Sequence, residues 1–240
     1  MKGRVIVVGG HTRNGGKTQL VCDVIAAFPE VNWVAGKITQ YGHGVCAQNG
    51  HDCDCAPEEH ICAIEWETSA VSGTDSARFL AAGAKKSFWL RTKQGFLAEG
   101  LPLLRESLDE AMRGLGCGDE VGEKRTAPSA NLRASTNGCV TIIESNSLMG
   151  FIKPSLYLAV VDPTKEDFKD SARAALDRAD VIVLRGEPSI HGGEEPVWMK
   201  FPAKLLREKP SVIQREGEEL PEPLQVLVQR VVEGTAEVVV

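Results

Sequence analysis

Short, largely apolar runs alternate with segments of helical periodicity along this chain. Residues 4–8 are typical of a fully buried strand, and the apolar positions of residues 17–28 recur at helical spacing. The same patterns predict further strands at residues 31–39, 86–91, 140–144, 156–162 and 181–184, with a short one from residue 211. They predict further helices at residues 75–82, 96–113, 166–178 and 221–232, and a closing apolar stretch at 238–240.

Strands that alternate with helices are typical of α/β proteins. Right-handed crossovers then build a mostly parallel sheet with helices on both faces, which is the fold predicted here. Because we find no internal repeat and no domain boundary, residues 1–240 are predicted to form a single domain. We expect residues 43–62 to be a Cys/His-rich insertion and residues 115–138 to be a flexible loop or lid.

Composition narrows the class of protein. Hydrophobic residues make up 42% of the 240 residues and charged residues 25%, as in soluble globular proteins. The net charge of -6 argues against a nucleic-acid partner, and the absence of long apolar stretches argues against a membrane partner. The N-terminal apolar run lacks a cleavage-like segment, so we expect a cytoplasmic protein. The odd number of cysteines, seven, favours reduced thiols or metal ligands over disulfides.

A glycine-rich turn, "GGHTRNGGKTQ", joins the first predicted strand to the first predicted helix at residues 9–19. Backbone N–H groups of such a turn and the helix N-terminus bind phosphate. The lysine would contact the β- and γ-phosphates, and the threonine hydroxyl would help to hold Mg²⁺. The predicted nucleotide-binding residues are Gly10, Arg13, Asn14, Gly15, Gly16, Lys17, Thr18, Gln19 and Lys37.

The turn departs from the usual P-loop template. Five residues separate Gly10 from Gly16, where the template has four, and His11 stands at the expected glycine position. A tight strand-to-helix turn without a ligand is therefore the alternative. Arg13 is either a cation that stabilises the γ-phosphate or an exposed loop arginine.

A nucleotide site with Mg²⁺ needs an acid at the end of a neighbouring strand. Glu144 ends the strand "CVTIIE" and would bind the metal through water or orient the attacking water. Asp162, at the end of "LYLAVVD", is the competing acid.

The chain resembles the P-loop family of the molybdopterin-guanine dinucleotide biosynthesis adaptor protein B. The resemblance is carried by the P-loop, by "VAGKITQ" with Lys37, by "GTDSARFLAAGA" at residues 73–84 and by "VTIIE". That family is grouped with MinD-like ATPases, dethiobiotin synthetase and nickel-insertion GTPases. The resemblance implies a P-loop NTPase fold and a role in molybdenum cofactor biosynthesis. It also implies that Asp75 and Lys37 lie near the γ-phosphate or the substrate, so the predicted catalytic residues are Lys17, Glu144 and Asp75.

The base of the nucleotide is left open between ATP and GTP. GTP-specific members of this class often carry Asn-Lys-x-Asp after a late strand, and the equivalent run here is "VIVLRGE". Glu187 is a candidate to imitate the aspartate, but the run favours a different base preference, and we expect ATP.

A second cluster of candidate ligands occupies residues 43–62. Cys46, Cys53, Cys55 and Cys62 are interleaved with three histidines, and thiolates with imidazoles suit Zn²⁺. An iron–sulfur cluster is the alternative metal centre. The alternative without a metal is a loop whose reduced cysteines bind nothing.

Three functions follow from these features. The first is an NTPase or small-molecule phosphotransferase that uses Mg²⁺. The second is a nucleotide-driven metal-delivery protein, and the third is a noncatalytic nucleotide-binding adaptor for a partner enzyme. We expect a nucleotide and a small-molecule or metal substrate as partners, with a homodimer as one assembly to test.

Overall fold

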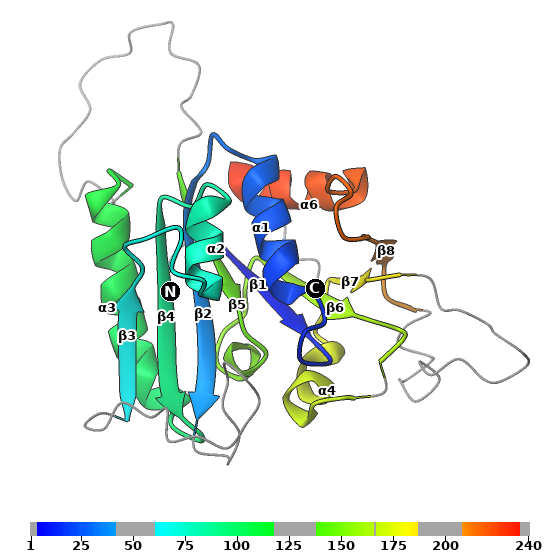
Figure 1. The fold of residues 1–240 in the computed structure, drawn as a ribbon, viewed down its shortest axis with the longest axis horizontal. Coiled ribbons are helices and arrows are strands. Elements are labelled where there is room, and N and C mark those ends of the chain that lie inside the picture. Colours follow the sequence, from blue (N-terminus) through cyan, green and yellow to red (C-terminus); the bar gives the residue numbers. More distant parts are fainter. Residues whose placement is uncertain (1–3, 42–60, 118–137, 166, 187–207, 236–240) are drawn as a thin grey trace, which may run out of the picture.

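The computed structural model describes residues 4–41, 61–117, 138–165, 167–186 and 208–235 (Figure 1). Its strands are β1 Arg4–Gly10, β2 Asn32–Tyr41, β3 Cys62–Trp66, β4 Lys86–Lys93, β5 Cys139–Glu144, β6 Leu156–Val161, β7 Val181–Leu184 and β8 Ser211–Ile213. Its helices are α1 Lys17–Ala27, α2 Asp75–Ala81, α3 Leu97–Gly114, the 3-10 helix η1 Ser147–Gly150, α4 Asp170–Leu176 and α6 Glu222–Glu233.

The strands form one eight-stranded sheet in the order β3-β4-β2-β5-β1-β6-β7-β8. Every neighbouring pair is parallel except β3 with β4, which is antiparallel at the edge. The prediction of a mostly parallel α/β fold is therefore confirmed.

Two hydrophobic clusters fill the two faces of the sheet. Because successive strand side chains point to opposite faces, Ile6 and Val8 of β1 join one cluster while Val5 and Val7 join the other. The first cluster includes apolar residues of α1, α2 and α6, and the second includes residues of α3, η1 and α4. Helices thus cover both faces, which leaves the carboxyl ends of the parallel strands as the edge where a site can form (Figure 1).

The structure differs from the predicted elements in two places. Strand β3 was not predicted, because it is only five residues long and pairs solely with β4. Helix α4 begins at Asp170 and not at residue 166, since the residues before it are hydrogen-bonded to the glycine-rich turn. None of the helices in the described ranges is long and apolar enough to cross a membrane.

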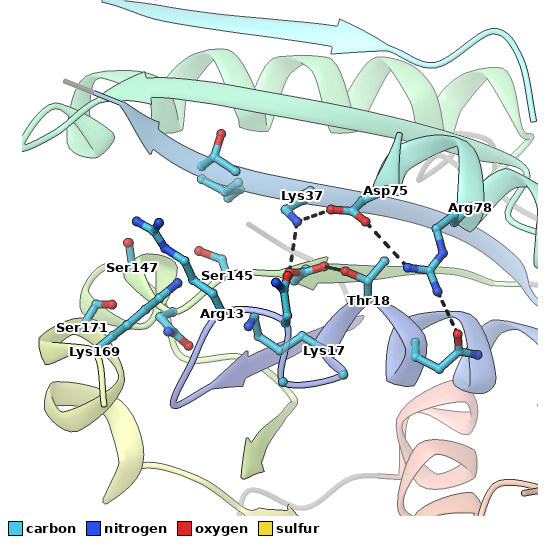
Figure 2. Close-up of a pocket in the computed structure, with 18 of the residues that line it drawn as sticks. Arg13, Lys17, Thr18, Lys37, Asp75, Arg78, Ser145, Ser147, Lys169 and Ser171 are labelled. Carbon is cyan, nitrogen blue, oxygen red and sulfur yellow. Dashed lines mark hydrogen bonds and ion pairs between the residues drawn. The ribbon is translucent and has the colours of Figure 1, made fainter. Parts of the chain in front are cut away.

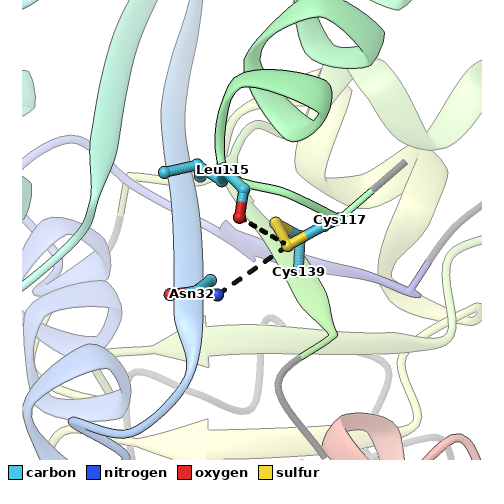
Figure 3. The surroundings of a disulfide bond; sticks show 4 residues. All are labelled: Asn32, Leu115, Cys117 and Cys139. Atoms are coloured by element: carbon cyan, nitrogen blue, oxygen red, sulfur yellow. Dashed lines mark hydrogen bonds between the residues drawn. A yellow bond between two sulfur atoms is a disulfide. The ribbon is translucent and has the colours of Figure 1, made fainter.

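The cysteine expectation was wrong for one pair. Cys117 and Cys139 form a disulfide, with 5.7 Å between their Cα atoms (Figure 3). The fold brings the residues after the C-terminal end of α3 next to the first residue of β5. The two cysteines therefore meet although 22 positions separate them. Residues 118–137, most of the predicted lid, lie outside the described ranges, as does the stretch at 238–240.

Candidate functional site

The glycine-rich turn between β1 and α1 has the backbone of an anion-binding loop. Asn14 has φ 50° and Gly16 has φ 85°, both in the left-handed region. Gly16 is the N-cap of α1, and no side chain caps the helix. The first N–H groups of α1 therefore face the pocket without an intrahelical acceptor, as an anion site requires.

Gly10 makes room for the side chain of Lys17. A Cβ at residue 10 would lie 2.9 Å from Cγ and Cδ of Lys17 and 3.0 Å from the Val160 carbonyl oxygen. The Lys17 ammonium folds back over its own loop and donates to the Thr12 carbonyl oxygen at 2.6 Å. Burial lowers the pKa of Lys17, and the nearby Glu144 carboxylate opposes that shift. The lysine is thus held over the loop that would surround a phosphate.

Asn146, which sequence reasoning missed, fixes the end of β1. Its Oδ1 accepts from the Gly10 N–H at 2.7 Å, and its Nδ2 donates to the Gly10 carbonyl at 2.8 Å. An amide that pairs both backbone groups of one residue holds the loop entrance in a single orientation. No spacing rule would have identified it, because Gly10 ends β1 whereas Asn146 lies 136 positions later, between β5 and η1.

Thr18 and Glu144 meet at the other side of the loop. The Thr18 hydroxyl donates to Glu144 Oε2 at 2.7 Å, and Glu144 is only 4% exposed (Figure 2). Strand register accounts for this meeting, because β5 lies between β1 and β2 and pairs Glu144 with both Val8 and Lys37. The predicted threonine and acid are therefore in direct contact.

Lys37 links Glu144 to Asp75. Its Nζ lies 3.3 Å from Glu144 Oε1 and also forms an ion pair with Asp75 (Figure 2). Burial alone would lower the pKa of Lys37, but the two carboxylates outweigh burial and raise that pKa. The structure thus brings together the predicted residues of the P-loop, β2, α2 and β5.

Glu67 holds the loop that carries Asp75, and sequence reasoning did not find it. Its Oε2 accepts from the hydroxyls of Thr74, Ser72 and Ser76 at 2.6, 3.0 and 3.0 Å. The Thr74 hydroxyl in turn caps α2 by accepting from the Ala77 N–H. These hydrogen bonds, the one from Thr74 first, lower the pKa of Glu67 to about 2.

The unusual His11 of the turn is explained by its surroundings. Its side chain is 1% exposed, its Nδ1 accepts from the Asp162 N–H at 3.3 Å, and its Nε2 lies 3.4 Å from the Lys165 carbonyl oxygen. Burial, the largest cause, lowers the pKa of His11, so a neutral ring that donates from Nε2 fits both contacts. His11 therefore braces the turn and does not line the phosphate cradle.

Residues 165, 167 and 169 are tied to the turn by further hydrogen bonds. Thr12 Oγ1 donates to Asp167 at 2.8 Å, and the Lys165 ammonium donates to the Asn14 carbonyl at 2.6 Å. The Lys169 N–H donates to the His11 carbonyl at 2.8 Å. The glycine-rich turn, which is one residue longer than the usual template, is therefore held by hydrogen bonds with the residues that follow β6.

Asp162, the competing acid, is engaged elsewhere. Its Oδ1 accepts from the N–H and hydroxyl of Thr164, and its Oδ2 lies 3.3 Å from the Lys165 ammonium. The geometry favours Glu144 as the acid beside Thr18.

Gln19, a predicted binding residue, and Arg185 hold α1 and its N-cap. Gln19 donates to Asp23 at 2.7 Å and accepts from Arg78 at 2.7 Å. Arg185, from the run "VIVLRGE", donates to the Gly16 carbonyl at 2.6 Å and lies 3.9 Å from Asp23. Glu187 lies outside the described residues, so ATP remains a prediction.

The side chains of Lys17, Thr18, Lys37, Asp75 and Glu144 line one pocket of about 1500 Å³ at the carboxyl ends of the strands. Its wall also includes Thr39, Trp89 and Gln94 on the β2 and β4 side, and Lys169, Ser147 and Ser171 near α4. The volume exceeds the ~300–1,000 Å³ of usual small-molecule sites, so there is room for a nucleotide and a second molecule.

No protein-family model matches the sequence, and no curated protein matches it. One similar solved structure is HypB from Helicobacter pylori in complex with nickel, with 12% identity, a TM-score of 0.46, and coverage of 98% of this chain and 91% of that one. Another is a Zn(II)-bound triple mutant of the YjiA GTPase, with 13% identity and a TM-score of 0.42. That alignment covers 93% of this chain and 61% of the other.

These similarities are too weak to assign a family or a ligand. Membership of the molybdopterin-guanine dinucleotide adaptor family therefore stays a prediction.

The predicted metal cluster is largely outside the described residues. Cys46, Cys53 and Cys55 lie there, whereas Cys62 begins β3. The Cys62 thiol lies 3.7 Å from the Phe96 carbonyl oxygen, and burial raises its pKa. In the ranges that the structure describes, no group of three or more His, Cys, Asp or Glu side chains is arranged to hold a metal ion. Zinc and iron–sulfur binding at residues 43–62 remain predictions.

Proposed function

We propose that this protein binds a nucleoside triphosphate with Mg²⁺ and cleaves off its γ-phosphoryl group, which passes to a small-molecule acceptor or to water. The observation that carries the proposal is the contact of Thr18 with the buried Glu144 beside Lys17 and the uncapped start of α1. A strand-to-helix turn that binds no ligand would not require a buried carboxylate beside Thr18.

The residues present fit Mg²⁺. This ion prefers hard oxygen ligands and is usually bound by one or two carboxylates or hydroxyls together with substrate phosphates. The Thr18 hydroxyl and the Glu144 carboxylate lie 2.7 Å apart on the pocket wall and would hold the ion, directly or through water. When bound, the ion would neutralise charge that develops on the phosphates.

The chain's own groups have separate tasks in this proposal. Lys17 and the N–H groups of residues 15–18 bind the phosphates, because their positive charge and orientation match the anion. Lys37 holds Glu144 and Asp75 in place through two ion pairs. Asp75 and Lys37 then face the γ-phosphate or the acceptor, as the sequence resemblance implies.

The test is nucleotide binding and turnover in Lys17→Ala. Removing a charge-assisted phosphate contact should weaken binding of a non-hydrolysable ATP or GTP analogue by at least about tenfold, or ~1.4 kcal/mol. Lys153→Ala is the matched control, because Lys153 is an exposed lysine that does not line the pocket. Unchanged affinity for both analogues in Lys17→Ala would overturn the proposal.

The same preparation separates the other two functions. Metal delivery would be supported if the metal content and metal affinity of the protein change when nucleotide is added. Capture of a partner enzyme without turnover would support an adaptor. Both alternatives depend on predictions for residues 43–62 or on the family resemblance, so phosphoryl transfer is the function that the described geometry favours.

A further inference from the structure

Two cations in the pocket have no counter-charge in direct contact. Within the described residues, neither the Arg13 guanidinium nor the Lys169 ammonium makes a hydrogen bond or an ion pair, although both line the pocket. Every other basic residue on this wall is engaged: Lys17 with Thr12, Lys37 with two carboxylates, Arg78 with Gln19, Lys165 with Asn14 and Asp162, and Arg185 with Gly16.

The surroundings of Lys169 are strongly positive. Burial first, and then the charges of Lys17, Arg13 and Lys37, lower the pKa of Lys169 to about 8. Asp167 is the acid that opposes these cations, and its carboxylate accepts from Thr12. A half-buried ammonium among other cations is costly unless an anion joins it.

Hydroxyl groups lie beside the two cations. Figure 2 shows Arg13 and Lys169 projecting into the same part of the pocket, with Ser147 and Ser171 next to them. Hydroxyls supply hydrogen bonds to an oxyanion without adding a competing negative charge. No carboxylate of the described residues is paired with either cation, in contrast to Lys37.

The position of this group separates it from the metal end of the pocket. In the sheet, β5 and β6 lie on opposite sides of β1, whose carboxyl end carries the P-loop. Glu144 and Lys37 project from the β5 and β2 side, whereas Lys169 and Ser171 follow β6, and Ser147 lies in η1 after β5. The two cations therefore meet the glycine-rich turn on its β6 side, whereas Thr18 contacts Glu144 on the β5 side.

We propose that Arg13 and Lys169, with Ser147 and Ser171 beside them, bind the carboxylate or phosphate group of an anionic small-molecule acceptor. The proposal rests on the function proposed above and adds the chemical class of the second substrate. Arg13 offers a planar pair of donors suited to a carboxylate or phosphate, and Lys169 offers a point charge.

Titration of sulfate, and separately of acetate, into protein saturated with a non-hydrolysable Mg²⁺–nucleotide analogue tests the site. With the nucleotide phosphates already in place, wild-type protein should still bind one anion. Lys169→Gln should weaken that binding at least about tenfold while leaving the analogue's affinity within about twofold, and Arg13→Gln should weaken the anion binding to a similar degree. Lys153→Gln, which removes the same charge outside the pocket, should behave as wild type. Preference for sulfate or for acetate distinguishes a phosphate-bearing acceptor from a carboxylate-bearing one.

Two results would overturn the proposal: no anion binding to the nucleotide-loaded wild type, or equal losses of analogue and anion affinity in Lys169→Gln. The second result would place Lys169 on the nucleotide's own phosphates. If the protein binds no nucleotide, the function proposed above fails by itself. Sulfate binding to the free protein that is lost in Lys169→Gln but kept in Lys17→Ala would then still support a separate anion site, and loss in Lys17→Ala alone would exclude it.

Discussion

The two ends of the pocket carry similar charged groups in opposite arrangements. At one end, Lys37 is paired with Glu144 and Asp75, and Thr18 is hydrogen-bonded to Glu144. At the other end, Arg13 and Lys169 are close to each other and have no paired acid among the described residues. At the first end, the charged groups pair with one another. At the second, the two cations would pair with the anion proposed above.

This contrast separates groups that position from groups that bind. Paired charges in a partly buried wall hold each other in one geometry, which favours precise placement of a metal ion and a reacting phosphate. Unpaired cations raise the local positive potential and attract a charged ligand. A single pocket can thus orient one substrate and recruit another.

Glu144→Gln should have the largest effect of any change at the paired end. Loss of the carboxylate charge removes an ion-pair partner of Lys37 and the proposed metal ligand, so turnover should fall about 100-fold while nucleotide affinity changes far less. Steady-state phosphate release and analogue titration measure the two quantities. Asp162→Asn provides the comparison with the competing acid, and a loss of turnover there as large as in Glu144→Gln would contradict the assignment.

Raising the pH should weaken anion binding at the unpaired end, by a smaller factor than the loss of turnover in Glu144→Gln. Because the pKa of Lys169 is about 8, its ammonium is mostly charged at pH 7 and mostly neutral at pH 9. Sulfate affinity of the nucleotide-loaded protein should therefore fall roughly fivefold to tenfold over that interval. Sulfate keeps its charge over this interval, so the loss reports on the protein's own groups.

The control for this pH effect is Lys169→Gln, whose weaker sulfate binding should show a flatter profile. Lys17, Lys37 and Asp167 also face Lys169, and bound nucleotide keeps Lys17 occupied during the measurement. An unchanged pH profile in Lys169→Gln would assign the titration to one of those neighbours.

Glu67→Gln should give the smallest effect, a local loosening of the loop that carries Asp75. Hydrogen exchange of the Ala77 amide, which donates to Thr74, should accelerate severalfold because the amide side chain accepts less strongly from the three hydroxyls. Glu65→Gln on the neighbouring strand β3 is the control. The same loosening in wild type should begin below pH 4.5, the ordinary pKa, and become complete as the pH falls through about 2, where Glu67 takes up its proton. Protection that persists at pH 2 would contradict this role.

Much of the sheet could be predicted because its strands are local patterns. β1, β5 and β7 are short apolar runs buried on both faces, and such runs are visible without any knowledge of their neighbours. β3 was missed because its five residues are mostly half-buried and it is held only by an antiparallel partner. The start of α4 was misplaced because Lys165, Asp167 and Lys169 bond to the glycine-rich turn before the helix begins.

The site divides in the same way. Gly16, Lys17 and Thr18 were predictable, because a strand, a glycine-rich turn and a helix start are contiguous in sequence, and the backbone conformation of that unit depends on residues within it. Glu67, Asn146 and the pair of Arg13 with Lys169 were not predictable as a group. Asn146 pairs with Gly10, and Lys169 lies near Arg13, in both cases from far along the chain. Glu67 has nearer partners, but only the folding of residues 72–76 back onto it brings their hydroxyls together.

The sequence by itself determined most of the order of strands and helices, the glycine-rich turn and the kinds of side chain available for chemistry, since these follow from local periodicity and from the steric needs of glycine. Only the tertiary structure decided which charges meet. The parallel register that sets Glu144 opposite Lys37, and the placing of β5 and β6 on either side of β1, arise from hydrogen bonds between distant segments. Those pairings depend on packing of the whole sheet, so the division of the pocket into a paired end and an unpaired end exists only in the folded chain.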